Sequence, residues 1–563
     1  MTDSSDMNTQ MRESLDTLFR KYENDDYMIL KLHNYVCNQL PTILENTKNT
    51  QLKRVVRNEE MMNEQDSFIQ TFLTNNVYLY VPSSERFFYY DGLHFKCTTE
   101  DNIIYHVLTA INEDRTLVPW KQKTKISTMK KIRENHLLKY IPESETIQLI
   151  LTLLYPSIFS SRNEAKYFLC VLGDNMMKPH SSNSLIHYID HEAKHFIREL
   201  NNIIQYFVGG NSIHSIKYKY HDHSYDDCRI IKTNSNIKHE NMWRHIIHEY
   251  GIDLLCVACH YSQRYGSSDN FVLNYANDSS LLNSSFYLKN NSSSDIVSRF
   301  LEQYIIINNN VIDPPIAVNE SELNVQQIRS PYVSWKDVMY LWKLFLNQND
   351  LPPIMFLQTL KTLVIEKLDK HYNEEKDLFI GISSKFLPGV KQFLSFWEET
   401  IVYDDNESDF EIDELVILYK KWCTTNEHNH YNFSNLQILD LIRHFFPNIE
   451  IDKERFLSGV CSKLWDKHID IQIALDNMRE TLRSEYSSKL VNNRVTSPGV
   501  AVNVSIYDTY NYYCKYHSSV QTNDTDSIQN SVVSKSYFEK YVFDNYCEFI
   551  VDNKFLSHSW YIE

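Results

Sequence analysis

The chain has 563 residues, a formal net charge of −17 and only 10 Gly and 14 Pro. So few chain-breaking residues leave few tight turns and many uninterrupted helices, which argues against barrels, propellers and Gly-rich nucleotide-binding folds. The balance of 42% hydrophobic and 23% charged residues is typical of a globular protein, and no run of 18 apolar residues predicts a membrane span.

Residues 1–75 are predicted to form N-terminal helices. Leu15, Leu18, Phe19 and Tyr22 fall on one face at helical spacing. The polar, acidic first residues do not resemble a signal peptide, and the ten cysteines are expected to be free thiols in a reducing compartment.

The hydrophobic period changes after these helices. Three runs, 77–81, 86–90 and 93–97, are rich in aromatic and β-branched residues, and Asp91-Gly92 between the last two is a strong type I′ turn signal. We therefore expect a small antiparallel β-hairpin element near residues 77–97 and little sheet elsewhere.

Helical patterns follow one another from residue 143 to residue 208. Ser161 and Glu164 form a capping-box pattern, and Gly173 stands where a C-terminal helix stop belongs. A further helical pattern runs from Trp243 to Tyr261.

Asn-, Ser- and Pro-rich stretches divide the second half of the chain. No internal repeat is detected. The predicted fold is mainly α, with stacked helix pairs and the one β-hairpin element. The predicted domains are N-terminal helices (1–75), a helical domain with the hairpin and a basic segment (76–275), a linker (276–332), a second helical domain with an acidic segment (333–485), a flexible linker (486–535) and a C-terminal docking helix (536–563).

Basic residues gather in two places although the chain as a whole is acidic. Lys217 and Lys219 alternate with tyrosines, a pattern that can meet a nucleic-acid backbone and its bases. The larger group comprises Lys121, Lys123, Lys125, Lys130, Lys131 and Arg133. All eight are candidate residues for binding RNA or DNA, and a solvated charged face is the alternative interpretation.

An acidic run with interleaved apolar residues is the candidate site for a basic protein partner. Its candidate residues are Asp404, Asp405, Glu407, Asp409 and Glu411. A solvated loop is the alternative interpretation.

Two short motifs suggest metal or haem chemistry. His191-Glu192-Ala193-Lys194-His195 matches H-E-x-x-H, which on one helix would present two imidazoles to zinc with Glu192 as general base. A solvated amphipathic helix is favoured instead, because Lys194 fits poorly and no third ligand follows. Cys256-Val257-Ala258-Cys259-His260 matches the haem c attachment pattern, but a buried helix is expected there.

No complete catalytic motif is present. The chain has no Gly-Lys pair, which excludes a P-loop ATPase, and it has no G-x-S-x-G elbow. No catalytic residue, metal site or cofactor is therefore predicted, and the sequence favours a non-enzymatic protein over an enzyme.

Four segments of the sequence resemble a protein family of giant DNA viruses of the mimivirus type. They are Trp120-Lys121-Gln122-Lys123-Thr124-Lys125, Ile141-Pro142-Glu143-Ser144-Glu145-Thr146-Ile147-Gln148, Ala165-Lys166-Tyr167-Phe168-Leu169 and Lys217-Tyr218-Lys219-Tyr220-His221. The resemblance implies a viral protein made and used in the host cytoplasm, near the virus factory. It implies no particular chemistry.

The first functional hypothesis is a scaffold that binds proteins and RNA. Stacked helix pairs offer long surfaces to several partners, and translation initiation factor 4G, which this chain resembles in expected architecture, bridges a cap-binding protein and an RNA helicase. Ligands of cap-binding proteins carry Tyr-x-x-x-x-Leu followed by an apolar residue. Tyr250-Gly251-Ile252-Asp253-Leu254-Leu255-Cys256 comes near this pattern, with Cys in the last position.

Two alternatives remain open. The expected hairpin and helices at 77–150 are similar to the region before the ATPase of poxvirus-type primase-helicases, which implies a DNA-replication accessory protein without an ATPase. The other alternative is a zinc hydrolase that uses His191, Glu192 and His195.

Overall fold

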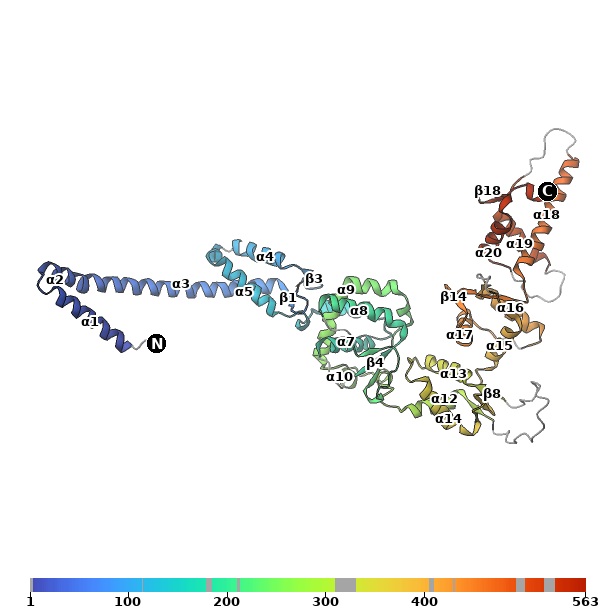
Figure 1. Cartoon of the computed structure of the whole chain (residues 1–563), viewed down its shortest axis with the longest axis horizontal. Coiled ribbons are helices and arrows are strands. Elements are labelled where there is room, and N and C mark those ends of the chain that lie inside the picture. Colours follow the sequence, from blue (N-terminus) through green and yellow to red (C-terminus); the bar gives the residue numbers. More distant parts are fainter. Residues whose placement is uncertain are drawn as a thin grey trace. The chain divides into compact units, whose positions relative to one another are not determined.

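The structure is a computed structural model in which the chain falls into two compact units (Figure 1). Unit 1 comprises Met1–Ser292 and Asp350–Phe356, and unit 2 comprises Ser293–Asn349 and Leu357–Glu563. The prediction of a mainly α fold is confirmed. No helix in the described part of the chain is long and apolar enough to cross a membrane. The residues described are 4–113, 115–178, 185–209, 213–308, 331–404, 410–428, 431–492, 502–520 and 532–562.

Unit 1 begins with helices that have almost no core of their own. They are α1 (Ser4–Tyr22), α2 (Asp26–His33), the π-helix η1 (Asn34–Gln39) and α3 (Leu40–Asn75). Asp25 caps α2, because its carboxylate accepts hydrogen bonds from the first free backbone N–H groups of the helix. The first buried side chain among the described residues is that of Gln65, and Ile69 and Phe72 on the same face of α3 are also buried.

A three-stranded antiparallel sheet follows α3. Its strands β1 (Val77–Val81), β2 (Arg86–Tyr90) and β3 (Phe95–Thr98) pair in the order β1-β2-β3. The predicted antiparallel β element near 77–97 is thus present, with one strand for each of the three runs. The sheet packs with α4 (Glu100–Glu113), the 3₁₀ turn η2 (Arg115–Trp120), α5 (Lys121–Glu134) and the 3₁₀ turn η3 (Leu137–Lys139).

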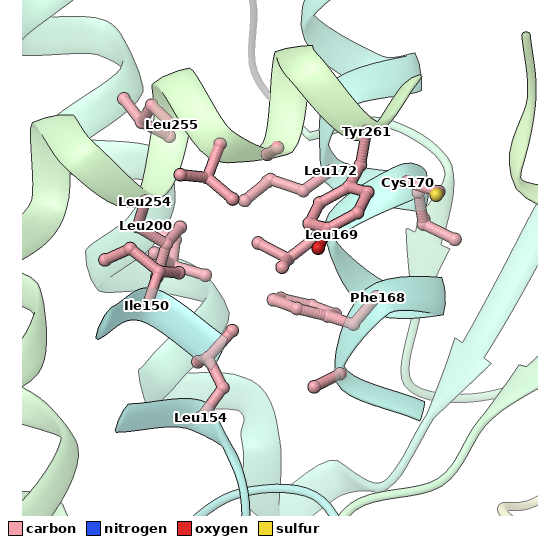
Figure 2. Packing of buried hydrophobic residues seen from close by; sticks show 14 of the residues in the cluster. Ile150, Leu154, Phe168, Leu169, Cys170, Leu172, Leu200, Leu254, Leu255 and Tyr261 are labelled. Carbon is pink, nitrogen blue, oxygen red and sulfur yellow. The ribbon is translucent and has the colours of Figure 1, made fainter. Parts of the chain in front are cut away.

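The main core of unit 1 lies between α6 (Ser144–Leu154), α7 (Arg162–Met177), α8 (Lys194–Phe207) and α9 (Glu240–Tyr265). Side chains such as Ile150, Phe168 and Leu254 interdigitate there, as Figure 2 shows. The predicted capping box of Ser161 and Glu164 opens α7.

The prediction that Gly173 ends a helix is wrong. Gly173 lies inside α7, which continues to Met177, and it faces the backbone of α9. A Cβ atom at this position would lie 2.2 Å from the carbonyl oxygen of Ala258. The glycine is therefore a point of close approach between two helices.

A small parallel sheet covers part of this core. Its strands β4 (Ile186–Ile189), β5 (Ile216–Lys217) and β6 (Cys228–Ile231) pair in the order β5-β4-β6, and α8 connects β4 to β5. Two short helices, α10 (Ser268–Asn274) and α11 (Ser279–Ser285), complete unit 1. The expectation of little sheet outside 77–97 is thus too narrow, because the described residues form seven small sheets.

Unit 2 contains the same order of elements three times, drawn from yellow to red in Figure 1. Each copy has a leading helix, a strand, two helices and a β-hairpin, and its three main strands pair in the order first, third, second. A helix-turn-helix followed by a hairpin that pairs in this way is the topology of a winged helix. We call the copies modules 1, 2 and 3.

The modules differ mainly in the connections between their elements. Module 1 comprises α12 (Ser293–Tyr304), β7 (Ile306–Ile307), β8 (Tyr332–Ser334), α13 (Trp335–Gln348), α14 (Leu357–Lys367), η7 (Asp369–His371), β9 (Tyr372–Asn373), β10 (Leu378–Ile380) and β11 (Ile382–Ser383). Module 2 comprises α15 (Pro388–Thr400), β12 (Ile401–Tyr403), β13 (Phe410–Glu411), α16 (Ile412–Thr425), α17 (Asn435–Phe445), β14 (Glu450–Asp452), β15 (Phe456–Ser458) and β16 (Val460–Ser462). Module 3 comprises α18 (Lys467–Asn492), β17 (Val504–Ser505), α19 (Ile506–Val520), α20 (Lys535–Asn545), η9 (Cys547–Phe549), β18 (Ile550–Val551), β19 (Phe555–Leu556) and α21 (Ser559–Ile562).

Corresponding positions of the modules have the same structural role. The strand before the two helices (β8, β13 or β17) ends in a residue whose side chain accepts from the backbone N–H three positions later: Ser334 from Asp337, Glu411 from Glu414 and Ser505 from Asp508. Each hairpin places one fully buried apolar residue in its last main strand: Phe379, Leu457 and Leu556. This correspondence is the evidence that the three copies are one repeated module.

The structure therefore corrects the failure to detect a repeat and the positions of the two expected linkers. Residues 276–332 include α11, α12 and β7, and residues 486–535 include the end of α18, β17 and α19. The stretches 309–330, 493–501 and 521–531 lie outside the described residues. The predicted C-terminal helix is present as α20, which packs with α19 inside module 3.

Candidate nucleic-acid interface

The larger group of basic residues lies on α5, on the side of that helix away from the core. Thr124, Thr128, Met129 and Ile132 are buried, and the helix packs against α3, α4 and β1. The cations occupy the other faces of the helix, so their charged ends point away from the core. Lys123, Lys130 and Arg133 are exposed, and Lys121, Lys125 and Lys131 are half-buried.

Most of the α5 cations lack an anionic partner. Arg133 is paired with Glu100, at 2.7 Å. Lys121 donates to the amide oxygen of Asn112, at 2.9 Å, and Lys123 lies 3.7 Å from the ring centroid of Trp120. Within the described part of the chain, none of the five lysines forms an ion pair with a carboxylate. In an acidic protein this leaves a cluster of uncompensated positive charge.

The second basic pair lies on a different element of unit 1. Lys217 ends β5 and is half-buried, and Lys219 is exposed in the loop that follows. The tyrosine after each lysine contacts another part of unit 1: the ring of Tyr218 lies against His191, and the backbone N–H of Tyr220 donates to the carbonyl oxygen of Pro353. This pair is therefore a less open surface than α5.

The acidic run does not form the exposed patch that the sequence suggests at Glu411. That carboxylate is buried, accepts two hydrogen bonds from Arg455, the shorter at 2.7 Å, and caps α16. Asp404 is half-buried, and Asp405, Glu407 and Asp409 lie outside the described residues. Glu411 is a structural group of module 2, so a partner that binds there would have to displace an ion pair.

The H-E-x-x-H motif does not lie on one helical face. His191 and Glu192 belong to the 3₁₀ turn η4 (His191–Ala193), and α8 begins only at Lys194. Glu192 pairs with Lys238 at 2.6 Å, and the Nδ1 atom of His195 lies 3.7 Å from a carboxylate oxygen of Glu240. The helical geometry that the motif requires is absent, and no group of three metal-ligating side chains occurs among the described residues.

Two other motifs lie inside the core, as their apolar neighbours suggested. Cys256 and Cys259 are buried in α9, and burial raises the pKa of both thiols. The Tyr250–Cys256 segment that approaches a cap-binding ligand lies in the same helix. Its Leu254 and Leu255 are buried, so they are not available to a partner while α9 stays folded.

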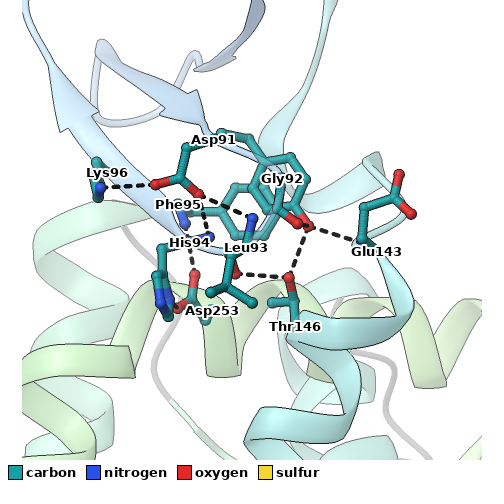
Figure 3. A network of polar contacts seen from close by, with 10 residues as sticks. Asp91, Gly92, Leu93, His94, Phe95, Lys96, Glu143, Thr146 and Asp253 are labelled. Carbon is teal, nitrogen blue, oxygen red and sulfur yellow. Dashed lines mark hydrogen bonds and ion pairs between the residues drawn. The ribbon is translucent and has the colours of Figure 1, made fainter.

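A polar network holds the sheet beside α5 against the main core of unit 1 (Figure 3). The buried carboxylate of Asp253 on α9 accepts the backbone N–H of Phe95, at 2.7 Å, and lies 2.8 Å from Nδ1 of His94. Thr146 on α6 donates to the carbonyl oxygen of Leu93, at 2.7 Å. Burial raises the pKa of Asp253, and its hydrogen bonds with Phe95 and His94 oppose that shift. The network fixes the sheet, and through β1 it fixes α5.

A pocket between α3 and α4 was not predicted from the sequence. A cavity of about 370 Å³ lies between the end of α3 and α4. Phe68 on α3 and Tyr105 and His106 on α4 are among its lining residues. Tyr105 carries the one signal that the sequence offered, because it places a large aromatic ring on the outer face of an amphipathic helix.

Charge is distributed unequally between the two units. Residues 293–349 and 357–563 contain 25 Lys and Arg against 38 Asp and Glu, so unit 2 carries −13 of the net −17. One cation on the second helix of each helix pair is neutralised within its own module: Lys361 by Asp377, Arg443 by Glu454 and Lys535 by Glu539. Lys367 at the end of α14 is exposed. The row of lysines on α5 is a denser group of cations than any of these three helices carries.

No protein-family model matches the chain, and a search of curated proteins gives no match either.

Proposed function

We propose that the chain is a non-enzymatic helical scaffold that binds RNA through α5 and proteins through the modules of unit 2. The observation that carries the proposal is the row of α5 lysines without carboxylate partners in a chain of net charge −17. Phosphate binding gains free energy from cations that release counterions, and such cations must not already be neutralised.

The modules are assigned to protein partners for the same physical reason. A helix-turn-helix that enters a DNA groove needs cations that contact the flanking phosphates. The second helices α14, α17 and α20 carry few cations, and one on each is paired with a carboxylate of its own module. Unit 2 as a whole has a net negative charge, which repels polyanions. A basic protein surface is the partner that complements this charge.

In its most concrete form the scaffold serves translation initiation in the host cytoplasm, bridging a cap-binding protein and an RNA helicase near the virus factory. Because Leu254 and Leu255 are buried, the cap-binding protein would be bound elsewhere than at Tyr250–Cys256.

A second candidate function is that of a DNA-replication accessory protein without an ATPase. The observation that favours it is the helix-turn-helix topology of the three modules, which many proteins use to bind duplex DNA. It predicts that duplex DNA binds to unit 2, where the first proposal predicts none.

Charge reversal on α5 tests the RNA assignment. Lys123 and Lys130 are exposed and seven residues apart, so they lie on one face of α5, roughly 10 Å apart along its axis. Lys123→Glu with Lys130→Glu should weaken binding of a labelled single-stranded RNA. It should also lower the slope of log K against log salt by about 0.7 for each phosphate that the variant no longer neutralises. The measurement is fluorescence anisotropy across a salt series.

The matched control reverses two exposed lysines at hairpin turns of unit 2, Lys376→Glu with Lys554→Glu. This variant changes the net charge by the same amount and should leave RNA affinity and salt slope as in the wild type. Equal losses in both variants would show a non-specific charge effect and would refute the assignment to α5.

Recovery of tagged protein from infected cells, with and without nuclease, separates the two candidate functions. A cap-binding protein and an RNA helicase that stay bound after nuclease treatment support the translation scaffold. Polymerase or primase components in their place support the replication accessory.

A further inference from the structure

The pocket between α3 and α4 combines aromatic rings with amide groups. Phe68 and Phe72 stack with their ring centroids 5.9 Å apart. Tyr105, from the opposite wall, keeps 67% of its surface exposed. Asn75 and Asn76 add carboxamide groups at the end of α3. A flat ligand with polar edges is the kind of molecule that such a pocket accommodates.

His106 is held in place by a neighbouring hydroxyl. Its Nδ1 atom lies 2.8 Å from the hydroxyl of Tyr78. This contact fixes the orientation of the imidazole ring, whose other nitrogen, Nε2, is a further polar group of a residue that lines the pocket. The carboxamides of the two asparagines add hydrogen-bond donors and acceptors.

Glu113 completes the lining and argues against a phosphate as the occupant. A carboxylate repels a phosphate, but it accepts hydrogen bonds from an exocyclic amine such as that of adenine or cytosine. The polar groups of this pocket therefore fit the edge of a nucleobase better than its backbone.

The helix that forms one wall of the pocket, α4, also packs against the basic helix α5. Lys121 at the start of α5 donates to Asn112, the residue next to Glu113 on α4. Arg133 at the other end of α5 pairs with Glu100 at the start of α4. One helix, α4, thus contributes lining residues to the pocket and contacts both ends of the basic helix.

We propose that this pocket binds one unpaired, amine-bearing nucleobase of a single-stranded RNA whose backbone is held by α5. Stacking on Tyr105 and Phe68 supplies affinity, and the amides and Glu113 favour adenine and cytosine over uracil. This inference rests on the proposed RNA binding of α5 and adds a base preference that cations cannot provide.

The test substitutes Tyr105 in the full chain and uses labelled 12-nucleotide oligo(A), oligo(C) and oligo(U) as probes. Tyr105→Ala should lower affinity for oligo(A) about tenfold and reduce the preference over oligo(U), with the salt slope unchanged. Tyr105→Trp should restore binding. A 2-aminopurine placed in the strand should be quenched by the wild type and not by Tyr105→Ala, since quenching reports stacking.

Tyr27→Ala is the matched control, because Tyr27 is also a helical tyrosine and is 66% exposed. It should bind as the wild type does. If the α5 charge reversal weakens binding while Tyr105→Ala leaves affinity and base preference unchanged, the pocket proposal is overturned and the RNA assignment stands. If the wild type binds none of the three probes, both proposals fail together.

Discussion

Gly173 offers the sharpest test of how unit 1 is packed, because α7 and α9 approach each other closely at that residue. In Gly173→Ala the new Cβ would lie 2.2 Å from the carbonyl oxygen of Ala258 and 2.7 Å from Cβ of Ser262. The first of these atoms is backbone, so the clash is relieved only if one helix moves. Both helices lie in the main core, where such movement disturbs the packing of many other side chains.

The expected magnitude follows from two opposing effects. Replacing a mid-helix glycine with alanine gains about 1 kcal/mol of helix propensity. Overpacking a well-filled core costs about 1–3 kcal/mol, and a clash with backbone belongs at the upper end. Gly173→Ala should therefore lower the free energy of unfolding by about 2 kcal/mol, equivalent to a fall of about 3 °C in the melting temperature of a unit of this size.

Gly251→Ala is the matched control on α9. Its Cβ would lie 2.7 Å from Cδ1 of Ile203, which is the far end of a flexible side chain. A change of rotamer relieves this contact at about 1 kcal/mol, which the gain in helix propensity offsets. The variant should therefore be close to neutral.

The assay is hydrogen exchange with mass spectrometry on peptides from α7 and α9, measured across a urea series so that unit 1 is followed separately from unit 2. Loss of protection in Gly173→Ala, with wild-type protection in Gly251→Ala, is the expected pair of results. Equal stability of the two variants would refute the close packing of α7 on α9 at this position.

Two further predictions concern buried titratable groups. Burial lowers the pKa of His187 to about 4, so below pH 6.5 the unfolded chain binds a proton that the folded chain does not. Unit 1 should therefore lose about 3 kcal/mol of stability between pH 6.5 and 4. In His187→Asn, the stability measured by urea denaturation should depend less on pH over this range. Lys467 and Glu414 form a buried ion pair of 2.7 Å between modules 3 and 2. Lys467→Met alone should destabilise unit 2 by about 3 kcal/mol in urea denaturation, because it leaves a buried carboxylate uncompensated. Adding Glu414→Gln should recover much of that loss. A double variant as unstable as the single one would argue against the ion pair.

Features encoded by neighbouring residues could be predicted from the sequence. The capping box predicted at Ser161 is present, because a cap needs only two side chains three positions apart. The β-hairpin element near 77–97 was likewise signalled by Asp91-Gly92 and by the aromatic runs on either side.

Features that depend on distant parts of the chain could not be predicted. Gly173 has the sequence context of a helix stop, and only the position of Ala258 shows why a side chain is excluded there. The four-residue spacing of His191 and His195 alone could not reveal that His191 lies in a 3₁₀ turn that precedes α8. The repeated modules share caps and a few buried positions but differ in the lengths of their connections, which removes any fixed period.

The candidate site shows the same division. The sequence identified the cations of α5, since a basic run is visible in composition, but it could not show which of them are neutralised. Arg133 is paired with Glu100, 33 residues away, and Glu411 with Arg455, 44 residues away. The first pairing removes one cation from the predicted RNA surface, and the second removes one carboxylate from the predicted protein-binding surface.

Compensation of charge, more than its sign, distinguishes the two units. An ion pair within one module contributes little attraction to a partner, because its field falls off steeply with distance in water. The lysines of α5 retain their field, and unit 2 retains a net negative field after its internal pairs are counted. The proposed partners, RNA and a basic protein, would consequently be attracted to different units of one chain and would not compete for the same charges.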